Sequence, residues 1–127
     1  MAFNLDHLDH LVLTVANIKA SIDFYTEVLG MELVTIDGSK ALIFGVQLIK
    51  LQQRGHELNP RAAHPQPGSG DLCFITTTPL TEVISDLADQ RIHIDEGPVE
   101  RTGALGKLRS IYIRDPDQNL IEIANYL

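Results

Sequence analysis

Apolar and polar positions follow the same order in two stretches of the chain. The first stretch opens with a β-branched apolar run over residues 8–15, and apolar residues then recur at spacings of three and four, at Ile18, Ile22, Tyr25, Val28 and Leu29. The run predicts a strand buried on both faces, and the spacing predicts an amphipathic helix that Asn17 caps and Gly30 ends. Strand-like runs complete a β-α-β-β-β order: residues 32–36, 41–44 and 47–52.

The second stretch repeats this order. A strand-like run over residues 71–76 precedes Thr78 and Pro79, which predict a helix with proline at its first position. The helix is apolar at Leu80, Val83, Ile84 and Leu87, and three strands are expected after it, at residues 92–95, 110–113 and 119–125. Since one unit of about 50 residues cannot bury its own sheet, the two units should complete each other within the chain or across a dimer.

The pattern therefore predicts an α+β fold of two β-α-β-β-β modules that form a cupped mixed sheet. We expect a single domain over residues 1–127, with module 1 at about 6–53, a connector at about 54–70 and module 2 at about 71–126. The connector is rich in proline and glycine and has no apolar pattern of its own. The open edges of two small sheets favour a homodimer.

Composition excludes several kinds of partner. The 127 residues carry 17 Asp plus Glu against 10 Lys plus Arg, a formal net charge of −7, so nucleic acid is not an expected partner. No apolar run approaches ~18 residues, so no membrane span is expected. The chain opens without the pattern of a secretory leader and has one cysteine, Cys73, which predicts a cytoplasmic protein. Cys73 lies in an apolar run and is expected in the core.

Four ionisable residues interrupt the predicted strands: His10, Lys50, Asp71 and Glu122. His10 and Asp71 fall on the first strands of modules 1 and 2, and Lys50 and Glu122 fall on the last strands. Each one alone could simply face water or be a satisfied core residue. If the modules are related by a pseudo-two-fold axis, the four strands converge on one concave face, where opposite charges or a metal ion would compensate the burial of these groups.

Five segments carry a resemblance to a known family: residues 9–15 (DHLVLTV), 21–25 (SIDFY), 28–31 (VLGM), 114–117 (RDPD) and 119–123 (NLIEI). They resemble the vicinal oxygen chelate superfamily, which includes glyoxalase I, fosfomycin-resistance thioltransferases, extradiol dioxygenases and bleomycin-resistance proteins. Residues 62–65, 97–99 and 101–104 look most like small glyoxalase-domain-containing members labelled virulence proteins. Gln118 stands where the superfamily usually has glycine, so we expect Asn119 to take the left-handed φ of that turn.

The resemblance implies cupped sheets that hold a divalent metal, with ligands from the first and last strands of each module. It implies His10 as the first ligand and Glu122 as the last, with Asp71 where many members place histidine. One imidazole and two carboxylates suit Zn, Mn, Fe or Ni. Glu122 could instead leave the metal and act as the catalytic base.

Two residues depart from the family's ligand pattern. Lys50 falls where glyoxalases place a glutamate, and its ammonium has no lone pair to donate. Gln52 stands where close relatives carry histidine. Lys50, Gln52 and Arg101 are instead expected to bind substrate. For Arg101 the reason is that a guanidinium pairs with an anionic group. The alternative for Arg101 is an exposed loop arginine without a role.

Two functions follow from these expectations. The first is a glyoxalase-family metalloenzyme acting on a small oxygen-rich molecule as a lyase, isomerase, thioltransferase or dioxygenase. The second is a metal-free protein of the bleomycin-resistance type that sequesters a small molecule, with Lys50 neutralising the two carboxylates. An ammonium a few ångströms from a divalent cation is repulsive, so the position of Lys50 bears on the choice.

Overall fold

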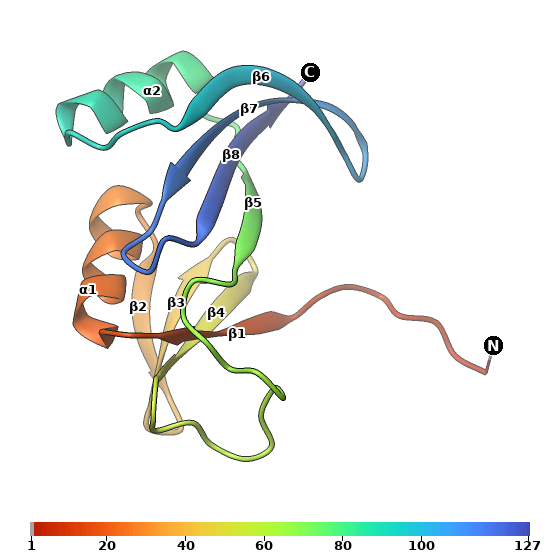
Figure 1. Ribbon diagram of the computed structural model, residues 1–127. Helices are drawn as coiled ribbons and strands as arrows, with labels where there is room; N and C mark the ends of the chain where they lie inside the picture. Colours follow the sequence, from red (N-terminus) through yellow and green to blue (C-terminus); the bar gives the residue numbers. More distant parts are fainter. Residues whose placement is uncertain (1) are drawn as a thin grey trace. The chain divides into compact units, whose positions relative to one another are not determined.

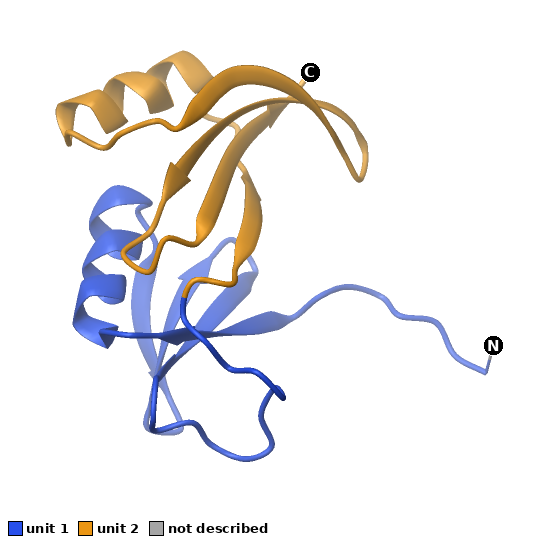
Figure 2. Ribbon diagram, in the orientation of Figure 1, with its two compact units in different colours: residues 1–67 blue, residues 68–127 orange. Residues whose placement is uncertain are grey.

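The computed structural model describes residues 2–127 and divides the chain into two compact units, residues 1–67 and 68–127 (Figure 2). Each unit contains a four-stranded mixed sheet and a helical segment, in the β-α-β-β-β order that the sequence predicts. The α+β fold and its two-module organisation are thereby confirmed. No helix in the described part of the chain has the length and apolar content that crossing a membrane requires.

Unit 1 begins with β1 (His10–Val15), α1 (Ile18–Asp23) and a π-helical turn, η1 (Phe24–Val28) (Figure 1). Its other strands are β2 (Glu32–Ile36), β3 (Ser39–Phe44) and β4 (Gln47–Gln53). The sheet order is β1-β4-β3-β2, in which β1 is parallel to β4 and the other neighbours are antiparallel. The first and last strands of the unit are therefore adjacent.

The helical segment of unit 1 has the ends that its capping residues predict. The Asn17 side chain accepts a hydrogen bond from the Ala20 N–H at 3.0 Å, which satisfies a donor of the first turn. Gly30 follows the segment with φ +70°, the left-handed conformation that ends a helix.

The preceding strand differs from expectation, because Val12 is 47% exposed while Leu13 and Val15 are buried. Strand β1 is thus buried on both faces only in its second half.

Unit 2 repeats the order with β5 (Asp71–Ile75), α2 (Leu80–Asp89), β6 (Glu96–Gly103), β7 (Gly106–Arg114) and β8 (Leu120–Tyr126). Its sheet order is β5-β8-β7-β6, again with the first strand parallel to the last. The two units therefore share one topology and one pairing pattern.

Strand β6 corrects the sequence prediction of a strand at residues 92–95. The strand begins at Glu96 and contains Gly97 and Pro98, which made the segment resemble a loop. Because β6 is the edge of its sheet, a proline without an N–H is tolerated there. Gly97 has φ +112°, and a Cβ on it would lie 2.5 Å from the Ser110 carbonyl oxygen. Only glycine allows this close approach of β6 to β7.

Helix α2 begins one residue later than predicted. Pro79 is the N-cap rather than the first helical residue, and its side chain makes no capping hydrogen bond. The cap comes from the last strand, where the Asn125 Oδ1 accepts the Leu80 N–H at 2.8 Å. The Asn125 amide also donates to the carbonyls of Thr76 and Thr78, each at 2.9 Å. One side chain therefore joins β8 to the whole β5–α2 connection.

The turn between β7 and β8 also corrects an expectation. Gln118, and not Asn119, has the positive φ, at +70°. Asn119 is fully buried, its Nδ2 donates to the Asp115 carboxylate at 2.8 Å, and its Oδ1 accepts the Gly70 N–H at 2.6 Å. These bonds hold the Asn119 backbone in place, so the strained conformation falls on the neighbouring glutamine.

Replacing Gln118 by glycine should raise the free energy of unfolding by roughly 1 kcal/mol, because a residue with a Cβ is strained at this φ. The measurement is chemical denaturation of the purified variant. The matched control is Gln90→Gly at φ −86°, where the same change should lower stability. Equal effects of the two substitutions would contradict the strain at position 118.

Replacing Asn125 by alanine should lower the free energy of unfolding by roughly 1–3 kcal/mol, since one acceptor and two donor bonds are lost together. Asn125→Asp keeps the Oδ1 that caps α2 but places a second carboxylate oxygen against the carbonyl oxygens of Thr76 and Thr78, so it should lower stability at least as much as alanine does. Thermal or urea unfolding measures both variants. A neutral Asn125→Ala substitution would show that the connection is held by other contacts.

Candidate functional site

Strand register in unit 1 places three predicted site residues on one face of the sheet. His10 pairs with Leu48, Val12 with Lys50, and Thr14 with Gln52. Because side chains alternate along a strand, His10, Lys50 and Gln52 share a face. The alternate residues point the other way and form the buried core with the helical segment: Leu13, Val15, Tyr25, Leu42, Ile49 and Leu51.

Unit 2 places the remaining predicted residues in the same manner. Asp71 pairs with Leu120, and Cys73 with Glu122, so Asp71 and Glu122 share a face. Tyr112 pairs with Glu122 across β7 and β8, which adds its ring to that face. The opposite face is apolar and nearly fully buried: Ile111, Ile113, Ile121 and Ile123.

The two registers reveal which residues of the units correspond. In unit 1 Val12 pairs with Lys50, and in unit 2 Cys73 pairs with Glu122. Two residues earlier on the first strand, His10 in unit 1 corresponds to Asp71 in unit 2. Lys50 is therefore the counterpart of Glu122. This one pair of equivalent positions carries opposite charges.

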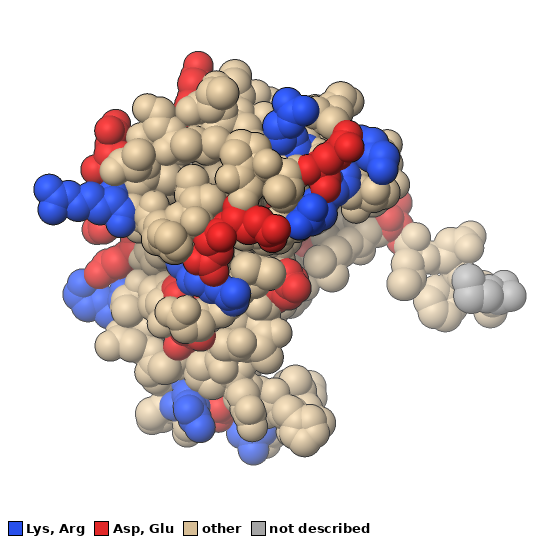
Figure 3. Space-filling view, turned by 45° about the horizontal axis from the view of Figure 1, so that its top comes forward, with Lys and Arg blue, Asp and Glu red and all other residues tan. Residues whose placement is uncertain are grey.

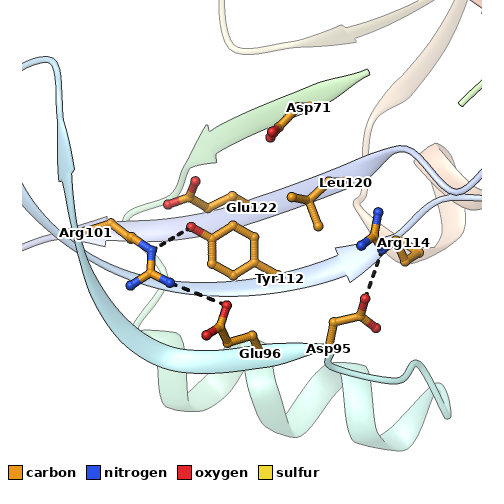
Figure 4. Close-up of a pocket in the computed structure, with 8 residues that line it drawn as sticks. All are labelled: Asp71, Asp95, Glu96, Arg101, Tyr112, Arg114, Leu120 and Glu122. Atoms are coloured by element: carbon orange, nitrogen blue, oxygen red, sulfur yellow. Dashed lines mark hydrogen bonds and ion pairs between the residues drawn. The ribbon is translucent and has the colours of Figure 1, made fainter. Parts of the chain in front are cut away.

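A pocket of about 560 Å³ lies over the polar face of unit 2 (Figure 4). Its lining residues all belong to this unit: Asp71, Asp95, Glu96, Arg101, Tyr112, Arg114, Leu120 and Glu122. Four of these are carboxylates and two are guanidiniums, so negative groups outnumber positive ones in the lining, and the positive charge is localised at the two arginines. Figure 3 shows acidic and basic side chains interspersed on the surface that faces the viewer, without a continuous basic patch there.

The Glu122 carboxylate is held by the sheet beneath it. The Ser110 hydroxyl donates to Glu122 Oε2 at 2.6 Å, and Ser110 is fully buried. A short hydrogen bond to a carboxylate is strong and restricts its orientation. Glu122 is therefore a preorganised acceptor facing the pocket.

Arg101 is a strand residue of β6 and not the loop residue of the alternative interpretation. Its Nε donates to the Tyr112 hydroxyl at 3.1 Å, and one terminal nitrogen donates to the Glu100 carbonyl at 2.9 Å. The other terminal nitrogen lies 3.4 Å from Glu96 Oε2. Burial raises the pKa of Tyr112, and the bond from Arg101 opposes this rise. Arg101 and Tyr112 thus form a hydrogen-bonded pair that lines the pocket.

His10 is oriented by its neighbour in sequence. Its Nδ1 lies 2.9 Å from Asp9 Oδ1, and this bond lowers the pKa of the Asp9 carboxyl. Since a carboxylate can only accept, Nδ1 carries a proton, and in the neutral imidazole Nε2 is then the nitrogen with the lone pair. On the same face the Gln52 amide donates to the Thr14 hydroxyl at 2.9 Å, which leaves the Gln52 oxygen available.

The structure brings together Asp71, Arg101 and Glu122 in unit 2, and His10, Lys50 and Gln52 in unit 1. Residues 2–127 contain no group of three His, Cys, Asp or Glu side chains arranged to hold a metal ion. The ligand set of His10, Asp71 and Glu122 draws on both units and stays a prediction. The sequence does not predict five of the residues that line the pocket: Asp95, Glu96, Tyr112, Arg114 and Leu120. It also does not predict Ser110, which bonds to Glu122. Ser110 and Tyr112 lie two residues apart on a predicted strand, and this spacing was the available signal.

Cys73 corrects another expectation, because it is exposed and not part of the core. It lies beside Glu122 on the polar face. Partial burial, followed by the negative charge of Glu122, raises the pKa of the Cys73 thiol to about 11. The protonated thiol is a weak nucleophile.

Cys73 should therefore react slowly with a thiol reagent at pH 8 in chelator-treated protein, since only roughly one part in a thousand is thiolate at that pH. Glu122→Gln removes a negative neighbour and should speed the reaction several-fold. Glu82→Gln, on α2, removes the same charge elsewhere in the unit and should leave the rate unchanged. Stopped-flow labelling measures all three proteins, and a fast wild-type reaction would contradict the raised pKa.

The fold and its polar sheet faces define a class: small proteins of two β-α-β-β-β modules with polar groups on the first and last strands. Residues 7–123 match the family model described as Glyoxalase/Bleomycin resistance protein/Dioxygenase superfamily. The chain belongs to this superfamily, as its sequence resemblance predicts.

Two relatives and two solved structures place the chain further. It is 57% identical over 124 residues to virulence protein STM3117 of Salmonella typhimurium, and the aligned region covers 97% of this chain and 86% of that protein. It is 51% identical over 120 residues to glyoxalase domain-containing protein RDO1 of Mycosarcoma maydis, which covers 94% and 68%. The crystal structure of STM3117 matches with a TM-score of 0.97 at 56% identity, over 98% of this chain and 100% of that one. Lactoylglutathione lyase from Agrobacterium tumefaciens shares the fold, with a TM-score of 0.73 at 24% identity over 95% and 94%.

Proposed function

We propose that this protein is a metalloenzyme of the glyoxalase superfamily that binds a divalent metal and a small oxygen-rich substrate. The reaction is of the lyase, isomerase, thioltransferase or dioxygenase type. The observation that carries the proposal is the position of His10, Asp71 and Glu122, each on the polar face of its sheet and opposite the buried core. Membership of a superfamily that generally uses divalent metals supports it.

The chemistry of these side chains fits a divalent cation. Asp9 fixes the proton of His10 on Nδ1 and leaves Nε2 to coordinate, an arrangement common in metal-ligating histidines. Ser110 orients the Glu122 carboxylate in the same manner. With Asp71, the donor set is one imidazole and two carboxylates, which suits Zn, Mn, Fe or Ni.

The bound metal would act as a Lewis acid toward neighbouring substrate oxygens. The residues of the chain would supply the remaining parts. Glu122 serves as a ligand or accepts a proton as the catalytic base, and its bond to Ser110 keeps the carboxylate oriented for either role. Lys50, Gln52 and Arg101 bind polar groups of the substrate.

The proposal extends to assembly and place of action. Residues 1–127 act as one domain whose modules lie at about 6–53 and 71–126, in a cytoplasmic homodimer that binds a small molecule and no nucleic acid. Superfamily members bind small molecules and often dimerise. Strands β1 and β5 are edges of their own sheets, and unpaired edges favour association with a further strand.

One observation favours a second function, a metal-free protein that sequesters a small molecule. Lys50 lies on the same face as His10 and is the counterpart of Glu122 in the other unit. An ammonium near a cation site is repulsive, whereas the same group near carboxylates is attractive. In this alternative Lys50 takes the place of the metal.

Elemental analysis of the untagged protein tests the choice. We expect about one divalent metal per chain in the wild type and a loss of roughly tenfold or more in metal affinity for His10→Ala and Glu122→Gln. His7→Ala is the matched control, since His7 also lies beside the preceding carboxylate, Asp6, at 2.6 Å. This variant should keep its metal.

Equal metal content in the wild type and His10→Ala would overturn the ligand assignment. Absence of metal, together with ligand binding that is lost in Lys50→Ala, would favour the sequestering protein instead. Ligand protection in a thermal melt, with and without chelator, measures that binding.

A further inference from the structure

The geometry points to a specific role for Glu96: it occupies the anion-binding side of Arg101 until an oxyanion of the substrate, a carboxylate or a phosphonate, displaces it. The inference rests on the proposed binding of a small oxygen-rich molecule, and it names the charge class of that molecule. Glu96 then sets specificity by competing with the ligand.

Arg101 is held in position by groups other than Glu96. Its Nε donates to Tyr112 and one terminal nitrogen donates to the Glu100 backbone, at 3.1 and 2.9 Å. The guanidinium carbon also lies 5.6 Å from the centre of the Tyr112 ring. The guanidinium therefore keeps its place when its contact with Glu96 is broken.

The contact with Glu96 is the longest of the set. The nitrogen and oxygen are 3.4 Å apart, and the side chains of Arg101 and Glu96 are 41% and 59% exposed. Exposed ion pairs of this kind contribute little to stability. A guanidinium has five N–H donors, so release of Glu96 leaves donors on both terminal nitrogens for the two oxygens of an incoming oxyanion.

Arg114, the other guanidinium of the pocket, provides the contrast. Its Nε lies 2.9 Å from Asp95 Oδ2, and a terminal nitrogen donates to the Gln118 carbonyl at 3.2 Å. The Asp95 contact joins the end of β7 to the segment before β6, and the Gln118 contact joins it to the turn that follows β7. We therefore infer that Arg114 holds neighbouring segments of unit 2 together, whereas Arg101 can exchange its longest contact for a ligand.

The position of the pair is also suited to a substrate. Glu96, Arg101 and Tyr112 line the same pocket as Asp71 and Glu122 (Figure 4). An oxyanion at Arg101 therefore leaves the rest of a small molecule lying along the sheet toward the Glu122 carboxylate. Because the pocket carries an excess of carboxylates, a localised guanidinium is needed to accept an anion there.

Nuclear magnetic resonance titration of the full chain tests this role, with the Arg101 Nε–H and the backbone amides as reporters. The probes are methylphosphonate, acetate and neutral acetamide. Glu96→Gln should tighten binding of the two anions by about two- to fivefold, the range that an exposed ion pair supplies. Arg101→Gln should weaken it by roughly tenfold or more.

Two matched variants control for net charge. Glu100→Gln removes the same charge from the same strand, but Glu100 pairs with Arg109 on the opposite face, so binding should not change. Arg109→Gln is the equivalent control for Arg101→Gln. Comparing the affinities for methylphosphonate and acetate distinguishes the two kinds of oxyanion. Neutral acetamide should produce no chemical-shift change at Arg101.

Equal tightening by Glu96→Gln and Glu100→Gln would overturn competition by Glu96. Absence of a saturable shift at Arg101 with either anion would overturn the oxyanion site itself. Binding that disappears with chelator and never shifts Arg101 would place the anion on a metal, which contradicts this inference and leaves the proposed metalloenzyme intact. Binding at Arg101 in a protein without metal would support the inference and contradict the metalloenzyme.

Discussion

The parallel pairing of the first and last strands of each unit is the constraint on which the rest of the structure depends. The β1–β4 and β5–β8 registers place residues far apart in the sequence on one face. A slip of one residue in either pair would exchange the two faces of a strand. In β8 such a slip would put Glu122 among the core side chains and Ile121 in the pocket, at the cost of burying a charge. The buried isoleucines therefore hold the Glu122 carboxylate in the pocket.

The sequence predicts the elements that an apolar core and clear capping residues define. Asn17 and Gly30 bound the helical segment of unit 1, and strand β2 has the predicted limits. It does not predict β6, because the edge position that tolerates Gly97 and Pro98 is a property of the whole sheet. It also assigns the positive φ to the wrong residue of a turn, because the hydrogen bonds of the buried Asn119 reach Gly70, distant in sequence.

The candidate site is predictable only as far as charges stand out against apolar strands. Asp71 and Glu122 interrupt such strands, and the structure places both in one pocket. Ser110 and Tyr112 do not stand out, since a hydroxyl and a ring are ordinary in a strand, and their roles depend on the β7–β8 register. Arg101 and Glu96 belong to the unpredicted strand. The polar contacts that orient the acidic and basic groups are thus a product of tertiary pairing.

The correspondence of Lys50 and Glu122 makes the polar faces of the two sheets chemically different. If both units carried a carboxylate at this position, both faces would be acidic. In this chain the polar face of unit 1 carries an imidazole, an amide and an ammonium, whereas that of unit 2 carries carboxylates and a guanidinium. Because the buried Ser110 hydroxyl holds the Glu122 carboxylate, Glu122 is the residue that we propose for proton transfer. The Lys50 ammonium is then suited to neutralising negative charge, on the substrate in the metalloenzyme or on the carboxylates in the metal-free protein.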